Sequence, residues 1–185
     1  PALRSHKMGI RTGLGLDITS NYASEMFTQM RVILADQRAQ DNDYVAMTYR
    51  GIPGRLYDDA DTALYLATMG GASAIHMEHE IGSITPGKKA DIQLIRYDSP
   101  NMTPMNDPVN AVVHYANVGD IDTVMVDGVI RKQGGKLVNI NWSDIAAQAE
   151  KSVSHIMEDS KIVNTEFNRR FWQQIFGGHV YVGDK

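Results

Sequence analysis

The sequence has no cysteine among its 185 residues. This absence excludes disulfide bonds, cysteine-ligated zinc and a cysteine nucleophile within these residues. The sequence also lacks any apolar run of about 18 residues, the length that a membrane-spanning helix requires. We therefore expect no membrane span, and a chain without disulfides is compatible with the cytoplasm, where we expect the protein to act.

Clusters of positive charge are missing as well. Lys and Arg number 18 against 22 Asp and Glu, which gives a net charge of −4. The pairs Lys88-Lys89 and Arg169-Arg170 are isolated, so no stretch offers the dense positive charge that binds phosphate backbones. Nucleic acid is therefore not an expected partner.

The composition that remains is that of an ordinary globular chain, with 43% hydrophobic and 22% charged residues. A chain of this length can enclose a hydrophobic core without disulfide bonds. The first residues, Pro-Ala-Leu-Arg-Ser-His, include neither an initiator Met nor an apolar signal core. We therefore expect these residues to be a fragment of a longer protein.

A strand and a helix are predicted at the start of the chain. Gly9–Leu16 contains three glycines between apolar residues and predicts a closely packed strand that ends at Asp17. Apolar residues at helical spacing then predict a helix over about residues 22–40, and the polar stretch 41–53 predicts a loop. A lone strand leaves its edges unpaired, so the strand must join a sheet supplied from elsewhere.

Near the middle of the chain, the spacing of the apolar residues changes from that of a helix to the alternation of a strand. A helix that begins at the acidic run 58–61 is predicted to end at Gly70-Gly71, because glycine readily adopts the left-handed cap conformation. A short helix is predicted at 72–75. Pro86-Gly87 then predicts a type II turn, and the alternating residues 90–97 predict a strand.

The last third mixes a hairpin with helices. Residues 121–126 and 129–132 predict two strands joined by a tight turn at Asp127-Gly128, and 109–115 predicts a short helical turn. Residues 143–160 predict a helix, and a final helix is predicted from Thr165. Its aromatic stripe is expected in a core or at a subunit interface, and consists of Phe167, Phe171 and Trp172.

Four stretches of the sequence resemble the C-terminal part of the metal-dependent amidohydrolase superfamily, in its chlorohydrolase and deaminase-like branch. Gly13–Asp17 with the following Glu25-Met26-Phe27-x-x-Met30-Arg31 resembles the eighth barrel strand and its helix. The stretch 63–72 resembles the family's A-L-x-x-A-T-x-x-G-A helix. Residues 81–92 resemble the G-S-[IL]-x-x-G-K-x-A-D segment, the most specific match, and 124–129 resembles the hairpin after it.

The resemblance implies an α/β fold, namely the C-terminal part of a (β/α)8 barrel with the C-terminal strands of a composite β-sandwich. Residues 1–80 would form the end of the barrel, 81–140 half of the sandwich, and 141–185 helices that pack back on the barrel. A complete barrel needs about 250 residues. The resemblance therefore also predicts a fragment.

Asp17 is the residue that the resemblance places at the chemistry. Catalytic side chains of such barrels project from the C-terminal ends of strands. By resemblance, Asp17 shuttles a proton between the attacking water and the leaving group, and contacts the metal. From the residues alone, the alternative is an aspartate that caps its own loop through backbone N–H groups. The following Ser20, Asn21 and Tyr22 are candidates for substrate contact.

The resemblance implies a divalent metal, zinc or iron, whose histidine ligands follow the first, fifth and sixth barrel strands. None of those strands is present here, and one carboxylate cannot form such a site. We therefore predict that the isolated chain binds no catalytic metal and is inactive.

Other chemically suggestive residues have simpler interpretations. The run His76-Met77-Glu78-His79-Glu80 resembles a metal cluster but is expected to be an exposed link between helix and strand. The remaining histidines are His6, His114, His155 and His179. Each is expected at the surface, or in the core with its hydrogen bonds satisfied. Gly13-x-Gly15 lacks the third glycine of a dinucleotide loop, and Ser20 lies in no Gly-x-Ser-x-Gly turn.

The function expected of the whole protein is hydrolysis of a non-peptide C–N bond in a small cyclic amidine, amide or amino-heterocycle. Deamination and dechlorination use the same attack of water and are not separated by these residues. The alternatives are a non-enzymatic β-containing binding module and a dihydroorotase-like ring-opening hydrolase. A homo-oligomer is expected because sheet edges are exposed.

Overall fold

The computed structural model describes residues 2–18, 23–55, 59–159, 170, 171 and 174. The chain consists of two compact units, residues 1–139 and residues 140–185. None of the described helices is long and apolar enough to cross a bilayer.

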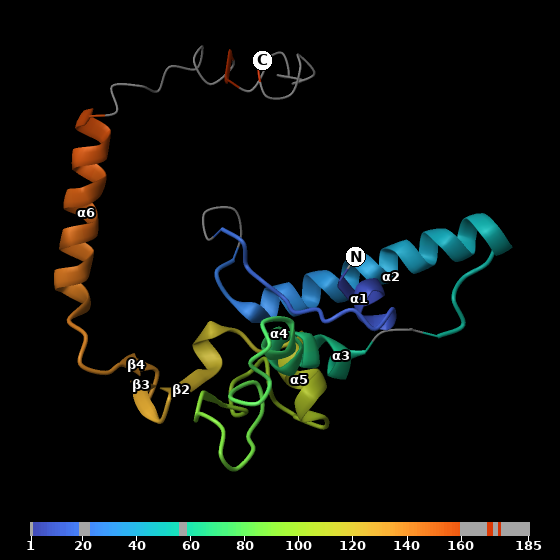
Figure 1. Ribbon diagram of the computed structural model, residues 1–185, viewed down its shortest axis with the longest axis horizontal. Coiled ribbons are helices and arrows are strands. Elements are labelled where there is room, and N and C mark those ends of the chain that lie inside the picture. The colour runs from blue at the N-terminus through green and yellow to red at the C-terminus, as the bar shows by residue number, and fades with distance from the viewer. Residues whose placement is uncertain (1, 19–22, 56–58, 160–169, 172–173, 175–185) are drawn as a thin grey trace. The chain divides into compact units, whose positions relative to one another are not determined.

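The helices of the first unit enclose its core. They are α1 (Ala2–Lys7), α2 (Met26–Tyr49), α3 (Ala60–Tyr65), the π-helical turn η1 (Leu66–Gly70), α4 (Gly71–Ala74), α5 (Pro108–His114) and the 3₁₀ turn η2 (Val118–Asp120). Helix α2 packs against α3 and α5, which also contact each other (Figure 1). Apolar side chains from α1, α2, α3 and α5 meet there, including Leu3, Met30, Leu34, Ala63 and Val113.

A four-stranded antiparallel sheet completes the first unit. Its strands β1 (Ile92–Ile95), β2 (Ile121–Val126), β3 (Val129–Gln133) and β4 (Lys136–Leu137) are paired in chain order. Asp127 and Gly128 both have positive φ angles, +49° and +77°, as the tight turn between β2 and β3 requires. The predicted strand, hairpin and short helix α5 are therefore confirmed.

The predicted type II turn is confirmed too. Gly87 has a φ of +93°, and the N–H of Lys88 donates to the carbonyl of Thr85 over 3.1 Å. Pro86 and Gly87 thus occupy the two central positions for which their backbone preferences suit them.

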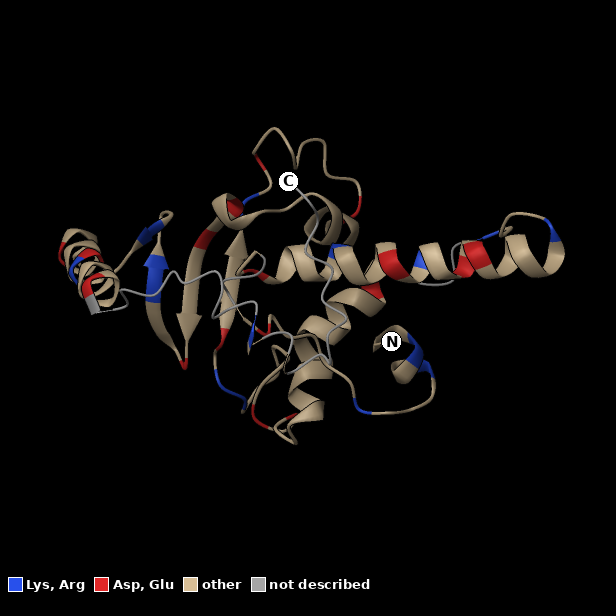
Figure 2. Cartoon of the chain, turned by 90° about the horizontal axis from the view of Figure 1, so that it is seen from above, with Lys and Arg blue, Asp and Glu red and all other residues tan. Residues whose placement is uncertain are grey.

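Helix α2 is longer than predicted, and the loop expected over 41–53 is wrong for residues 41–49. The polar residues of its second half bond along the helix, with Gln37 donating to Asp41 over 2.9 Å. The charged residues of this half are Arg38, Asp41 and Asp43, and Figure 2 shows blue and red segments along the helix. The helix ends where Arg50 adopts a left-handed φ of +53° and its N–H donates to Ala46. Polar residues without Gly or Pro do not stop a helix, so composition alone misplaced its end.

The helix end predicted at Gly70-Gly71 is also wrong. Both glycines have right-handed helical angles, with φ of −61° and −60°. The helix continues through the π turn η1 into α4, which confirms the short helix predicted after it at 72–75. The two glycines serve close packing instead of chain reversal.

The strand predicted over Gly9–Leu16 is not observed in the described residues. Residues 10–18 contain neither helix nor strand. A strand needs a neighbour to accept its backbone hydrogen bonds, and the sheet β1–β4 pairs only with itself. This segment lies along α3, η1 and α4, as described below.

The second unit contains helix α6 (Trp142–Asp159). The predicted helix over 143–160 is thus confirmed within one residue at each end. The backbone N–H of Ser143 donates to the Asn141 side chain over 3.2 Å, and the Asn141 amide donates to Asp144 over 2.8 Å. Of the predicted aromatic stripe, Phe167 and Trp172 lie outside the described residues, while Phe171 is half-exposed.

Candidate functional site

The segment that leads to Asp17 packs along the helix formed by α3, η1 and α4. The N–H of Leu14 donates to the carbonyl of Leu66 over 3.1 Å. A Cβ atom on Gly13 would lie 2.6 Å from the Cα atom of Gly71, and one on Gly70 would lie 2.6 Å from the carbonyl oxygen of Thr12. We call these six residues the glycine seam: Thr12, Gly13 and Leu14 against Leu66, Gly70 and Gly71.

The glycine seam explains the glycines that the sequence analysis assigned to a strand and to a helix end. Real Cβ atoms do not approach a backbone atom to 2.6 Å, so Gly13 and Gly70 permit a contact that any side chain would prevent. The seam lies at the π turn η1, and such turns frequently occur at functional sites. The backbone leading to Asp17 is thereby held directly against a helix.

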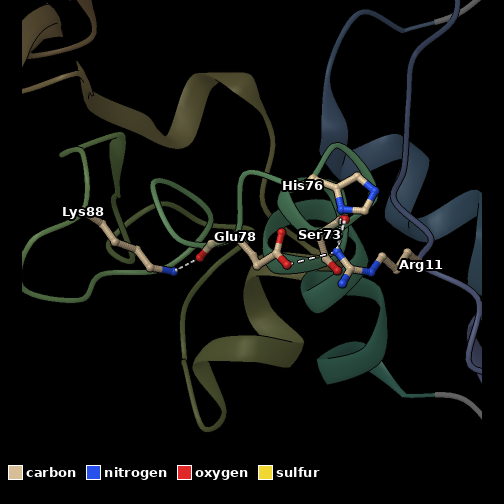
Figure 3. A network of polar contacts seen from close by, with 5 residues as sticks. All are labelled: Arg11, Ser73, His76, Glu78 and Lys88. Atoms are coloured by element: carbon tan, nitrogen blue, oxygen red, sulfur yellow. Dashed lines mark hydrogen bonds and ion pairs between the residues drawn. The ribbon is translucent and has the colours of Figure 1, made fainter.

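A polar cluster extends the glycine seam at its far end. The Nη1 atom of Arg11 lies 3.2 Å from the carbonyl oxygen of Ser73, 3.0 Å from Nδ1 of His76 and 3.0 Å from Oε1 of Glu78. Figure 3 shows these three groups gathered around the guanidinium at the end of α4. We call these four residues, Arg11, Ser73, His76 and Glu78, the Arg11 cluster.

The charges of the Arg11 cluster favour its contacts. The backbone N–H of Glu78 and the nearby Arg11 guanidinium hold the pKa of the Glu78 carboxyl below its ordinary value, despite the opposing effect of burial. Glu78 is therefore ionised at neutral pH. The Nδ1 atom of His76 can accept the Arg11 hydrogen bond only in the tautomer that is unprotonated there.

Lys88 holds the loop that carries Glu78. Its ammonium donates to the carbonyl oxygens of Glu78 and Ile81 and to the hydroxyl of Ser83, the last over 2.8 Å (Figure 3). Three donors on one ammonium thus meet three oxygens of a single loop. The lysine of the G-K-x-A-D match therefore has a structural role in this chain.

Asp17 lies three residues beyond the glycine seam. Its side chain is exposed, and its backbone has a left-handed φ of +58°, a conformation that aspartate tolerates better than most residues. The loop that Asp17 would cap continues through residues 19–22, which lie outside the described residues, so the loop-capping alternative stays open. Ser20, Asn21 and Tyr22 lie outside the described residues.

A divalent metal needs three or four protein ligands. In the described parts of the chain, no three His, Asp or Glu side chains lie close enough to hold an ion. Asp17 would therefore be a single ligand, and the residues present do not by themselves fit a complete metal site.

The run His76–Glu80 forms an irregular link, as predicted, since residues 75–91 contain neither helix nor strand. Its acidic side chains bind cations of the chain: Glu78 pairs with Arg11 over 3.0 Å and Glu80 with Lys89 over 3.1 Å. The link thus joins helix α4 to the sheet and holds the segment before Asp17.

Among the other histidines, His114 is half-buried, and the His6 ring lies tilted by 41° against Tyr65 with 5.2 Å between ring centroids. Burial, together with the charges of Arg38 and Arg31, lowers the pKa of His114. The imidazole is therefore neutral at neutral pH.

A buried carboxylate supports the junction of α5 with the sheet. Asp120 accepts hydrogen bonds from the Asn101 amide over 2.8 Å and from the backbone N–H of Asn117 over 2.9 Å. Burial alone would raise the pKa of Asp120. The neighbouring Ser99 hydroxyl and these two donors outweigh it and hold the pKa below its ordinary value.

Arg11 belongs to none of the motifs that the sequence shows. Its side chain meets residues 62 to 67 positions later in the chain, a distance that no local pattern records. The available signal was a cation two residues before Gly13, in a segment otherwise composed of apolar residues, Gly and Thr.

Comparison with known proteins shows which family the chain is similar to. Residues 1–131 match the model of the amidohydrolase family. The chain is 33% identical over 155 residues to a 5-methylthioadenosine/S-adenosylhomocysteine deaminase of Acetivibrio thermocellus, covering 82% of this chain and 33% of that protein. It is 30% identical over 154 residues to a 5'-deoxyadenosine deaminase of Methanobrevibacter smithii, with the same coverage.

Solved structures share the fold. A zinc-bound adenosine deaminase from Xanthomonas campestris matches with a TM-score of 0.71 and 24% identity, over 83% of this chain and 33% of that one. A zinc complex of atrazine chlorohydrolase from Arthrobacter aurescens matches with a TM-score of 0.68 and 19% identity, over 82% and 31%.

The chain spans about a third of the length of the curated relatives it matches, as expected of a piece of a longer protein. The α/β fold and the family predicted from the four sequence stretches are confirmed. With the match over residues 1–131 and the shared fold, the chain belongs to the amidohydrolase family.

Proposed function

We propose that the whole protein containing this chain is a hydrolase that removes the exocyclic amino group of a small amino-heterocycle, with Asp17 as its proton-transferring carboxylate. The observation that carries the proposal is the placement of Asp17. It follows a backbone segment packed against a helix through the glycine seam, and its side chain is exposed.

The proposed step is hydrolytic deamination. A water molecule attacks the ring carbon that carries the amino group, and the Asp17 carboxylate takes a proton from that water. Asp17 then returns the proton to the amino nitrogen, which leaves as ammonia while the ring carbon keeps the oxygen. One carboxylate can serve both transfers because it takes the proton from the water before it gives the proton to the amino nitrogen.

We also propose Asp17 as one contact of a divalent metal, zinc or iron, whose other ligands lie outside these residues. When bound, such an ion supplies a water of lowered pKa. Two of the structural neighbours are described with zinc, which supports a divalent ion in the whole protein.

The names of the relatives support an aminopurine nucleoside as the substrate. The two relatives described above act, by name, on 5-methylthioadenosine, S-adenosylhomocysteine or 5'-deoxyadenosine. Dechlorination of a ring is the second candidate, favoured by the shared fold with atrazine chlorohydrolase. Release of ammonia or of chloride distinguishes the two reactions.

Two further parts of the proposal concern the whole protein, and a third concerns this chain. We propose action in the cytoplasm and a homo-oligomeric state. We also propose division of this chain into the end of a barrel (1–80), half of a β-sandwich (81–140) and packing helices (141–185).

Ammonia release from 5'-deoxyadenosine by the whole protein tests the proposal. Asp17→Asn keeps the shape of the side chain but removes its basicity, so kcat is expected to fall by about 10²–10⁴-fold. The matched control is Asp43→Asn, an exposed aspartate on α2, which is expected to leave kcat unchanged. Wild-type kcat in the Asp17→Asn variant would overturn the role of Asp17.

Metal analysis of the isolated 185-residue chain tests the ligand assignment separately. We expect it to bind no stoichiometric zinc or iron after purification. Stoichiometric metal that is lost on Asp17→Ala would show that the ligands lie within these residues, contrary to the proposal.

A further inference from the structure

We infer that Arg11 is a positioning residue that acts on Asp17 by attaching the segment before it to the end of α4. The inference rests on the proposed role of Asp17. It adds a residue that no sequence match assigned and that itself lies outside the reacting groups.

The attachment points of the segment carry the inference. Between residues 11 and 14, the segment is held by the Arg11 cluster and by the glycine seam. Beyond Leu14, no backbone hydrogen bond to the rest of the unit is found within the described residues up to 18. Three residues of extended chain span about 10 Å, so the attachments at 11–14 limit how far Asp17 can lie from the glycine seam.

Arg11 is the only side chain among these attachments that forms an ion pair, at least within the residues that the structure describes. The glycine seam consists of backbone contacts, which fix how closely the segment approaches the helix. The Arg11 contacts with Ser73 and Glu78 oppose sliding of the segment along the helix. A small displacement of a catalytic group costs much of its effect.

The cluster has firm support on its other side. Lys88 binds the carbonyl oxygens of Glu78 and Ile81 and the Ser83 hydroxyl, so the loop that presents Glu78 is held in place. The connected residues run from Lys88 through Glu78 to Arg11. The G-K-x-A-D stretch, although it lies far along the sequence, thus supports the segment before Asp17.

The effect of Arg11 is expected to be local. The Arg11 and Glu78 side chains are 50% and 36% exposed, and exposed ion pairs contribute little to global stability. A purely structural role would therefore change little, whereas a positioning role would lower kcat without a matching loss of stability.

Steady-state kinetics of the whole protein test the inference. We expect Arg11→Ala to lower kcat by about 10- to 100-fold, with KM and the thermal unfolding midpoint near those of the wild type. Arg11→Lys restores a charge that can meet Glu78 but not all three acceptors, so its kcat is expected to lie between the two. The control is Arg96→Ala, which removes a similarly exposed ion pair with Asp98 at 3.1 Å and is expected to have wild-type kcat.

Amide hydrogen exchange in the whole protein gives a readout that does not depend on activity. In Arg11→Ala, the amide of Leu14, which donates to Leu66, is expected to exchange faster than in the wild type, while Arg96→Ala leaves it unchanged. Unchanged exchange in Arg11→Ala would overturn the inference.

The kinetic outcomes separate the two proposals. If Asp17→Asn is inactive but Arg11→Ala has wild-type kcat, the positioning role of Arg11 is overturned and the proposed function stands. Full activity of Asp17→Asn overturns the proposed function and this inference with it.

Discussion

The backbone N–H of Asp127 donates a hydrogen bond to Oδ1 of Asp91 over 2.7 Å. The neighbouring N–H of Gly128 donates to the carbonyl of Ala90 over 3.1 Å. The two residues before β1 therefore bind the turn between β2 and β3, and the aspartate of the G-K-x-A-D stretch holds the sheet together.

Asp91→Ala removes the acceptor of the Asp127 N–H. We expect this variant to lose about 0.5–1.5 kcal/mol of unfolding free energy, because the hydrogen bond is exposed and water can bind the N–H in place of the carboxylate. Urea unfolding measures the loss. Asp91→Asn keeps an acceptor oxygen and should lose less, and equal losses in both variants would contradict this role.

Gly13→Ala tests the glycine seam. The added Cβ atom would lie 2.6 Å from the Cα atom of Gly71, so the backbone must shift, at an expected cost of about 1–3 kcal/mol in unfolding free energy. Gly15→Ala is the matched control in the same segment, since its Cβ would meet no atom within 4 Å. It is expected to change stability by less than about 1 kcal/mol. A comparable loss in both variants would show that the seam is not tight.

Leu34→Ala tests the core between α2, α3 and α5. Leu34 is fully buried, with 1% of its surface exposed, so truncation is expected to cost about 2–5 kcal/mol of unfolding free energy. Val32→Ala, on the exposed side of α2, should change it by about 0.5 kcal/mol or less. Denaturation of both variants in urea gives the comparison, and similar midpoints would be inconsistent with this core.

Acid sensitivity is expected from Asp120. Its pKa is lower in the folded chain than in the unfolded chain, so the folded state binds this proton less tightly. Asp120 therefore stabilises the fold above its unfolded pKa of about 4. That contribution is lost as the pH falls through the lower folded-state pKa.

Urea midpoints between about pH 6 and pH 2 measure this effect. The wild type should lose more stability over that range than Asp120→Asn, which carries no titrating carboxyl at this position. Parallel loss in both proteins would assign the acid sensitivity to other groups.

Local patterns were sufficient for much of this chain. The hairpin at Asp127-Gly128, the turn at Pro86-Gly87 and the start of α3 at Asp59 follow from backbone preferences of a few adjacent residues. Asp59 accepts a hydrogen bond from the N–H of Thr62 over 3.0 Å, as a helix-capping aspartate does. Interactions of this kind form between residues that are adjacent in the sequence, so the sequence alone predicts them.

Where one sequence pattern suits two different structures, the sequence did not decide between them. Gly70-Gly71 suits a helix end and close packing equally well, and only the approach of Gly13 and Thr12 selects the second. Gly9–Leu16 has the composition of a packed strand, yet a strand depends on partners that the segment itself does not contain. The end of α2 depended on Arg50, whose left-handed conformation no residue preference predicts.

The sequence by itself was enough to identify the family, through the resemblance of four short stretches to it, and that resemblance singled out Asp17 as the candidate for chemistry. Tertiary structure alone brought Arg11 to Ser73 and Glu78, and Lys88 to the loop that carries Glu78. The physical reason is one of range. Turns and caps arise between neighbours in the chain, whereas these contacts join residues that only the packing of α4 and its link brings within hydrogen-bond distance.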